Sequence, residues 1–253
     1  MFSRLFSRAA VPSEPVSAYV PAGSRIYAIG DMHGRLDLLE RLRMMIAEDA
    51  HRHPIDRKVV VYLGDYVDRG PDSRGVIDLL AREPLPGFES IFLKGNHEDS
   101  LLEFLVDPGV APGWMTYGGD AALFSYGVRP PDARKVEEIL AAQQAFIKAL
   151  PPAHLDFLRA LKLVHIEGDY AFVHAGFREG VPIAFQNPED MMWIRDEFLW
   201  SNADFGKIAV HGHTIAEQPQ IRGNRIGIDT GAFATGTLTC LVLEGAERRF
   251  LAT

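Results

Sequence analysis

The chain has 253 residues, of which 47% are hydrophobic, and a formal net charge of −8. These values describe an ordinary globular protein with a sizeable core, and the acidic balance argues against an extended nucleic-acid interface. No apolar run reaches the roughly 20 residues that a membrane-spanning helix needs. The single cysteine, Cys240, excludes an intrachain disulfide and is typical of a reducing compartment. We therefore expect a cytoplasmic protein without integral membrane association.

Residues 1–22 are expected to form a flexible N-terminal leader. Pro12, Pro15 and Pro21 interrupt any signal-peptide core in this segment. A frayed leader is favoured over contact with a membrane surface. Residues 23–253 are then expected to form one folded domain.

Strand and helix patterns alternate through the first part of the domain. Strands are predicted over residues 25–30, 58–63 and 89–94, and helices follow the last two at about 73–82 and 97–106. Another amphipathic helix follows the first strand. Such alternation predicts an α/β fold with a parallel sheet and right-handed crossovers.

The middle of the chain, about 107–160, has a different character. It begins with a loop-like stretch, and helices are predicted over 132–149 and 151–160. We interpret this segment as a helical insertion beside the mouth of the site and not as a separate domain.

The last third of the chain is rich in strand patterns separated by turn residues. The predicted strands are 161–166, 169–174, 207–211, 219–222, 225–229 and 236–244. The turn residues between them predict mostly antiparallel pairing. Two sheets packed face to face, with helices outside, are the natural assembly of these elements.

Five short blocks place metal-ligand side chains after apolar runs. The blocks are GDMHG (30–34), GDYVDRG (64–70), GNHE (95–98), HAG (174–176) and HGHT (211–214). Loops at strand ends converge on one crevice in an open α/β sheet. The carboxylate, amide and imidazole groups of the blocks suit a pair of hard or borderline divalent cations.

The order of these blocks resembles the phosphoprotein phosphatase (PPP-type) family of the calcineurin-like metallophosphoesterases. The similarity runs from about residue 25 to 231 and is greatest to compact bacterial Ser/Thr protein phosphatases. The stretches GPDSRGVIDLL, WMTYGGDAALFSYG, MMWIRDEFL and RIGIDTGAF also resemble that branch. The resemblance implies a four-layer α/β/β/α sandwich of two mixed sheets with flanking helices. It also implies six metal ligands, which are Asp31, His33, Asp65, Asn96, His174 and His213.

Asp65 is the candidate bridging ligand, because a carboxylate has two oxygens and can hold two cations. The resemblance implies that His97 lies off the metals and is held by Asp68, so we expect His97 to act as a general acid. Arg69 is expected to bind phosphoryl oxygens through its planar guanidinium group. The resemblance implies a second phosphate-binding arginine, Arg195.

Some assignments stay open at this point. Arg195 could instead start a helix and pair with an adjacent acidic residue. His211 precedes His213 by two residues and could face the same side, but we rank it as a supporting or structural residue. Glu98 is read as a helix-start residue, where the helix dipole favours negative charge. Trp114 is read as part of the core of the insertion.

The predicted function is a metal-dependent phosphomonoester hydrolase, a Ser/Thr protein phosphatase that acts on a phosphorylated protein or peptide. Two divalent metal ions are expected, with manganese preferred and iron or zinc as alternatives, and no nucleic acid. The alternative is a dinucleoside-polyphosphate (diadenosine tetraphosphate) hydrolase; such enzymes typically carry Ala at the position of Asp68 and Asp at that of Glu98. A non-catalytic binding module is disfavoured because all six ligand positions are filled.

Overall fold

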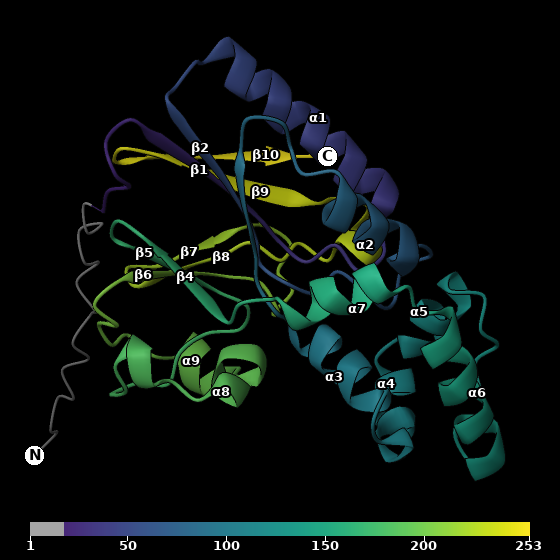
Figure 1. The fold of residues 1–253 in the computed structure, drawn as a ribbon. Coiled ribbons are helices and arrows are strands. Elements are labelled where there is room, and N and C mark those ends of the chain that lie inside the picture. Colours follow the sequence, from purple (N-terminus) through teal and green to yellow (C-terminus); the bar gives the residue numbers. More distant parts are fainter. Residues whose placement is uncertain (1–17) are drawn as a thin grey trace, which may run out of the picture.

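The computed structural model describes residues 18–253 and contains two five-stranded mixed sheets that pack face to face. The strands of the first sheet are, in spatial order, β10 (Glu247–Ala252), β9 (Thr239–Glu244), β1 (Ser24–Ile29), β2 (Arg57–Tyr62) and β3 (Glu89–Phe92). Those of the second are β4 (Val164–Glu167), β5 (Tyr170–Val173), β6 (Ile208–His211), β8 (Arg225–Gly227) and β7 (Gln220–Ile221). With helices on both outer sides, this is the four-layer α/β/β/α sandwich that the sequence predicts (Figure 1).

Helices cover the two outer faces and fill one end of the sandwich. Helices α1 (Leu36–Arg52) and α2 (Ser73–Arg82) lie outside the first sheet, and α8 (Pro188–Trp193) and α9 (Asp196–Leu199) outside the second (Figure 1). The remaining helices are α3 (Asn96–Phe104), α4 (Ala111–Thr116), α5 (Gly119–Ser125), α6 (Val136–Ala149), α7 (Pro152–Arg159) and α10 (Ala232–Thr235). Two short 3₁₀ helices are η1 (Pro108–Val110) and η2 (Ile183–Phe185). Within residues 18–253, no helix is both long and apolar enough to cross a membrane.

The first sheet has the predicted parallel core. Strands β1, β2 and β3 run parallel, with Ile26 opposite Val59 and Val61 opposite Ile91. The predicted strand at 236–244 joins this sheet as β9, antiparallel to β1, so it does not extend the second sheet. Strand β10, which pairs with β9 in a hairpin, was not predicted.

The expectation of mostly antiparallel pairing in the last third is wrong for the centre of the second sheet. Strands β5, β6 and β8 run parallel, and only the outer strands β4 and β7 are antiparallel to their neighbours. Between β5 and β6 the chain makes a crossover that carries α8 and α9. Such a crossover returns the chain in the same direction, whereas a tight turn would reverse it.

The insertion starts with helices where a loop was predicted. Residues 108–125 form η1, α4 and α5 in quick succession. Pro112 lies in the first turn of α4, where a missing backbone N–H costs no hydrogen bond. The proline and glycine residues that indicated a loop therefore mark the starts of short helices.

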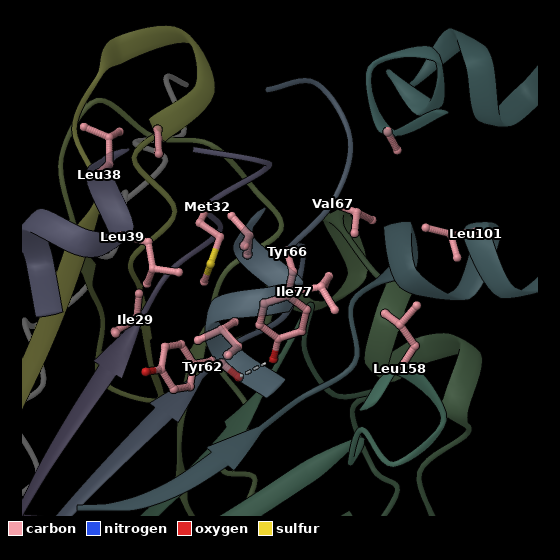
Figure 2. Close-up of a cluster of buried hydrophobic side chains, with 14 of the residues drawn as sticks. Ile29, Met32, Leu38, Leu39, Tyr62, Tyr66, Val67, Ile77, Leu101 and Leu158 are labelled. Atoms are coloured by element: carbon pink, nitrogen blue, oxygen red, sulfur yellow. Dashed lines mark hydrogen bonds between the residues drawn. The ribbon is translucent and has the colours of Figure 1, made fainter. Parts of the chain in front are cut away.

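Apolar side chains alternate between two layers of core along the inner strands. On β1, Ile26 and Ala28 pack between the sheets, while Tyr27 and Ile29 pack under the helices of the first face. Figure 2 shows part of this helix-side cluster, where Tyr62 and Tyr66 lie close together. The Tyr66 hydroxyl donates a hydrogen bond to the Leu93 carbonyl at 2.7 Å, so its polar end is satisfied within the core.

Most of the expected leader, residues 1–17, lies outside the described residues. The next residues pack against the domain. Ala18 and Val20 are buried in the cluster between the sheets, and the Val20 N–H donates to the Gly245 carbonyl at 3.1 Å.

Candidate metal centre

The six candidate ligands come from the carboxyl ends of five strands. Each side chain is buried, with at most 6% of the residue exposed. They are Asp31 and His33 after β1, Asp65 after β2, Asn96 after β3, His174 after β5 and His213 after β6. Face-to-face packing of the two sheets brings these strand ends to one place, as predicted for an α/β fold.

The Asp65 carboxylate lies between two groups of imidazoles. Its Oδ2 is 3.5 Å from Nε2 of His33 and 3.8 Å from Nε2 of His97. Its Oδ1 is 3.4 Å from Nε2 of His174, and His213 completes this second group. In each group of three, the ligand atoms lie within 4.8 Å of one another. Two potential cation sites therefore share one carboxylate.

Asn96 adds an oxygen atom to the second group, and Asp31 lies beside it. Oδ1 of Asn96 lies 3.0 Å from Nε2 of His174 and 2.9 Å from Nδ1 of His213. Oδ2 of Asp31 accepts a hydrogen bond from the backbone N–H of His213 at 2.9 Å. Oδ1 of Asp31 and Nε2 of His213 are buried without a partner among the described residues. Buried polar atoms normally have partners, so the unpaired Asp31 oxygen indicates a site that a bound group completes. His213 faces the second group with Nδ1 and not with Nε2.

Two of the histidines have the hydrogen bonds that orient metal ligands. Nδ1–H of His33 donates to the Val67 carbonyl, and Nδ1–H of His174 donates to the Leu63 carbonyl, both at 2.9 Å. A carbonyl only accepts, so each imidazole holds its proton on Nδ1 and presents the lone pair of Nε2 to the site. These inward-facing lone pairs, together with the carboxylate and amide oxygens, fit a divalent cation.

The backbone is strained at these positions. Within the part of the chain that the structure describes, the non-glycine residues with positive φ are His33, Asp65, Asp68, Arg69 and His213. A left-handed conformation costs such a residue about 1–2 kcal/mol. All five were predicted as site residues, and strain of this kind is concentrated at functional sites.

Buried carboxylates make the site favourable for cations. Burial, together with the neighbouring Asp229 and Asp65, raises the pKa of Asp31 well above its ordinary value. Burial alone would raise the pKa of Asp65, but the surrounding histidines lower it strongly. Burial also raises the pKa of Asp229 to about 6. Three buried carboxylates so close together are stabilised if cations bind between them.

His97 is held by Asp68 at the edge of the first group. Its Nδ1–H donates to Oδ2 of Asp68 at 2.7 Å, and the same oxygen accepts from Nε1 of Trp114 at 2.8 Å. Burial acts to lower the pKa of His97, but Asp65 and Asp68 outweigh it and raise the pKa above the ordinary value. The distance from His97 to Asp65 permits a ligand role as well, since this imidazole belongs to the same compact group as His33.

Two arginines lie at the site. Nη1 of Arg69 is 2.9 Å from Nε2 of His33, and the guanidinium lies 4.9 Å from the ring centre of Phe233. Nη1 of Arg195 donates to the His213 carbonyl at 3.4 Å. No ion pair joins Arg195 to an acidic neighbour in residues 18–253, so the alternative helix-start pairing is not formed there.

Sequence reasoning missed three supporting residues. Glu98 accepts hydrogen bonds from the backbone N–H groups of Asp65 at 2.9 Å, Tyr66 at 2.7 Å and Gly95 at 2.9 Å, so it holds the loop that carries Asp65. Trp114 contacts Asp68, and Phe233 contacts Arg69. Glu98 was detectable as the N3 residue of a capping box in GNHE, whereas the two aromatic contacts join distant segments and had no local signal.

His211 lies apart from the metal centre. Its ring packs edge-on against Phe198, with the ring centres 5.1 Å apart, outside both groups of ligands. The two-residue alternation that could have placed it beside His213 holds only within a strand. β6 ends at His211, and His213 has a φ of 63°.

Comparison with known proteins identifies the class. Residues 24–234 match the calcineurin-like phosphoesterase family. The chain belongs to this family and is a metallophosphoesterase, a hydrolase of a class that uses a binuclear divalent metal centre. This confirms the family and the enzyme class predicted from the five sequence blocks.

Among curated relatives, two kinds of enzyme are equally similar to this chain. A bis(5'-nucleosyl)-tetraphosphatase PrpE of Geobacillus thermodenitrificans is 28% identical, and the match covers 84% of this chain and 88% of the relative. Serine/threonine-protein phosphatase 2 of Escherichia coli is also 28% identical, with 85% and 90% covered.

A crystal structure attributed provisionally to a diadenosine tetraphosphatase superimposes with a TM-score of 0.60, at 22% identity and 96% coverage of both chains. At this identity the structural likeness supports the fold alone.

Proposed function

We propose that this protein is a metal-dependent phosphomonoesterase that removes phosphate from serine or threonine side chains of proteins or peptides. The observation that carries the proposal is the pair of His97 and Asp68 beside the shared carboxylate of Asp65. An alkoxide is a poor leaving group and needs a proton as the phosphorus–oxygen bond breaks. The leaving phosphate of an anhydride needs this help much less.

Six residues would hold two divalent cations, and Asp65 would bridge them. Asp31 and His33 would bind the first cation, and Asn96, His174 and His213 the second. Two such cations supply Lewis acidity and lower the pKa of water, which is the chemistry that phosphoryl transfer uses. We propose manganese for the site, with iron or zinc as alternatives, since the mixed oxygen and nitrogen donors contain no thiolate.

The remaining residues bind the phosphoryl group and supply a proton. Arg69 and Arg195 donate hydrogen bonds to the phosphoryl oxygens and stabilise the charge that spreads over them in the transition state. Nε2–H of His97 gives its proton to the departing serine or threonine oxygen. Asp68 keeps that imidazole in the right tautomer, and Trp114 keeps Asp68 in place.

The second candidate is hydrolysis of a dinucleoside polyphosphate, which the PrpE relatives favour. A direct comparison separates the two. The manganese-loaded protein is assayed with a phosphoserine peptide and with diadenosine tetraphosphate, and kcat/KM is measured for each. The proposal predicts that the peptide has the larger kcat/KM by at least about tenfold. The reverse order would replace it with the second candidate.

A further inference from the structure

A second pocket lies outside the metal centre, between the end of α9 and the strands β6, β8 and β7. Its volume is about 380 Å³, which is within the range of small-ligand sites. The lining includes Trp200, Asn202, Gln220, Arg222 and Arg225. No acidic side chain lines it among residues 18–253, although the whole sequence carries 34 Asp and Glu residues. The pocket is therefore positively charged in a protein of negative net charge.

Arg225 gives this pocket a buried charge without a counterion. The residue is only 8% exposed, and its guanidinium donates to the carbonyl oxygens of Leu199 and Ser201 and to Oδ1 of Asn224. No carboxylate pairs with it in the described chain. Burial, and then the neighbouring Arg222, lower the pKa of Arg225. A buried cation that contacts only neutral acceptors is stabilised when an anion binds beside it.

At the base of the pocket, His211 has an unpaired ring nitrogen and Gly227 leaves space in front of it. Nε2 of His211 is buried and has no hydrogen-bond partner in the described residues, and the residue is 3% exposed. A Cβ added to Gly227 would lie 3.0 Å from this nitrogen. The φ of Gly227 is not positive, so its backbone does not require glycine. The glycine instead keeps space open in front of the imidazole.

Both walls of the pocket continue segments of the metal centre. Thr214 directly follows His213 in the chain. The opposite wall is the end of α9, and this helix begins after Arg195, which reaches the His213 carbonyl. The pocket is therefore joined through the backbone to His213 and Arg195, two residues of the site where the phosphoryl group is expected.

Another basic pocket does not share these properties. It is lined by Arg25, Arg52 and Arg249, but Glu244 and Glu247 line it too. Arg25 already pairs with Glu244 at 2.7 Å. Arg52 pairs with Glu48 and Arg249 with Asp49, so each arginine of this pocket already has an acidic partner.

We propose that the pocket of Arg222 and Arg225 binds a second anionic group of the substrate, a carboxylate or phosphorylated side chain that flanks the phosphoserine or phosphothreonine. This inference rests on the proposed function. The two guanidinium groups attract the anion, and the amide of Gln220 can donate a hydrogen bond to it. Trp200, which is 81% exposed, covers the apolar part of the bound segment.

Two peptides that differ only in charge test the inference. Both contain phosphoserine; one has glutamate on each side of it and the other has glutamine. The manganese-loaded full chain should show a kcat/KM about tenfold larger for the glutamate peptide, with the difference shrinking at high salt. Equal values for the two peptides would overturn the inference, whereas failure to hydrolyse either peptide would overturn the proposed function.

Substitutions at exposed positions locate the effect. Arg222→Ala should abolish the preference while it leaves kcat/KM for the glutamine peptide unchanged, and Gln220→Glu should reverse it. Arg129→Ala removes an equal charge from an exposed arginine outside this pocket and should keep the full preference. A preference that survives both pocket variants would contradict the assignment.

Two further measurements separate binding from turnover and identify the source of the anion. Peptides with a phosphonate in place of the phosphoserine phosphate are not hydrolysed, so calorimetry gives their Kd directly. The glutamate form should bind about tenfold more tightly, and only to chains that keep Arg222. The proposal fails if the wild type has the same kcat/KM for both peptides and Arg222→Ala lowers kcat/KM for diadenosine tetraphosphate. The pocket would then bind a polyphosphate chain.

Discussion

The carboxylate of Glu98 accepts a hydrogen bond from the backbone N–H of Asp65 at 2.9 Å, although 33 residues separate them in sequence. The same side chain accepts from the N–H groups of Tyr66 and Gly95. Asp65 itself has a φ of 53°, so its backbone is held in a strained conformation. The carboxylate shared by the two groups is therefore positioned by a residue that belongs to neither group.

Glu98→Gln should weaken metal binding, because an amide cannot accept all the backbone N–H groups with the strength of a carboxylate. Loss of such support around a metal ligand typically costs about 10–100-fold in affinity. Metal affinity is measured by competition with a chelator. Glu103→Gln changes an exposed residue on the same helix and should have no effect. Equal affinity for the two variants would show that Glu98 only caps the helix.

His97→Asn should lower kcat for a phosphoserine peptide by about 10²–10⁴-fold, the usual contribution of a general acid. The loss should be much smaller with p-nitrophenyl phosphate, because nitrophenolate leaves without a proton. Two metals per chain should remain, as measured by elemental analysis. A loss of metal would identify His97 as a ligand, and an equal loss of kcat with both substrates would exclude the general-acid role.

Arg195→Ala should weaken the binding of vanadate to the metal-loaded protein by about 10–100-fold, because one charge-assisted contact contributes about 1.5–3 kcal/mol. Arg195→Lys should restore only part of the affinity, since a lysine cannot form the bidentate contact. Inhibition constants measured side by side decide the question. If vanadate binds the alanine variant as well as the wild type, Arg195 has a structural role only.

Acid should reveal the contribution of Asp49 to stability, because its partners Tyr27 and Arg249 are not residues of the site. Burial acts to raise the pKa of Asp49, but hydrogen bonds from Arg249 and Tyr27, each 2.6 Å long, outweigh it and lower the pKa. A carboxyl group with a lowered pKa in the folded state stabilises the protein above its unfolded pKa of about 3.9. That stability is lost as pH falls through the folded pKa.

Asp49→Asn should therefore lower the free energy of unfolding by about 1–3 kcal/mol at pH 7, and the difference from wild type should shrink below about pH 4. Urea unfolding at several pH values measures this. Glu40→Gln, an exposed change on the same helix, is the control. A gap between Asp49→Asn and wild type that stays constant down to pH 3 would contradict the explanation.

The layers of the fold and the convergence of the candidate ligands could be predicted because each depends on short local patterns. Asp31, Asp65 and Asn96 each follow an apolar run, and parallel strands deliver such residues to one edge. The helix at Ser73–Arg82 was predicted with its observed bounds, since apolar residues recur at helical spacing between clear turn signals.

The parts that were missed depend on contacts between distant segments. Strands β5, β6 and β8 are parallel because long connections bring the chain back to the same end of the sheet before each new strand. Turn residues do not indicate such connections. The hydrogen bond from Trp114 to Asp68 joins the insertion to the second block, 46 residues apart. Strand β10 contains Arg248 and Arg249, which obscure its alternation, and it forms through pairing with β9.

The most direct test of the shared site is the metal content of Asp65→Asn. An amide oxygen can bind one cation but is a poor bridge between two, so we expect both metals to be lost or to be bound far more weakly. Elemental analysis of purified protein, with Asp99→Asn as a control outside the ligand set, should find about two metals per chain in wild type and control and well under one in Asp65→Asn. Two tightly bound metals in Asp65→Asn would show that the two groups of ligands do not depend on a common carboxylate.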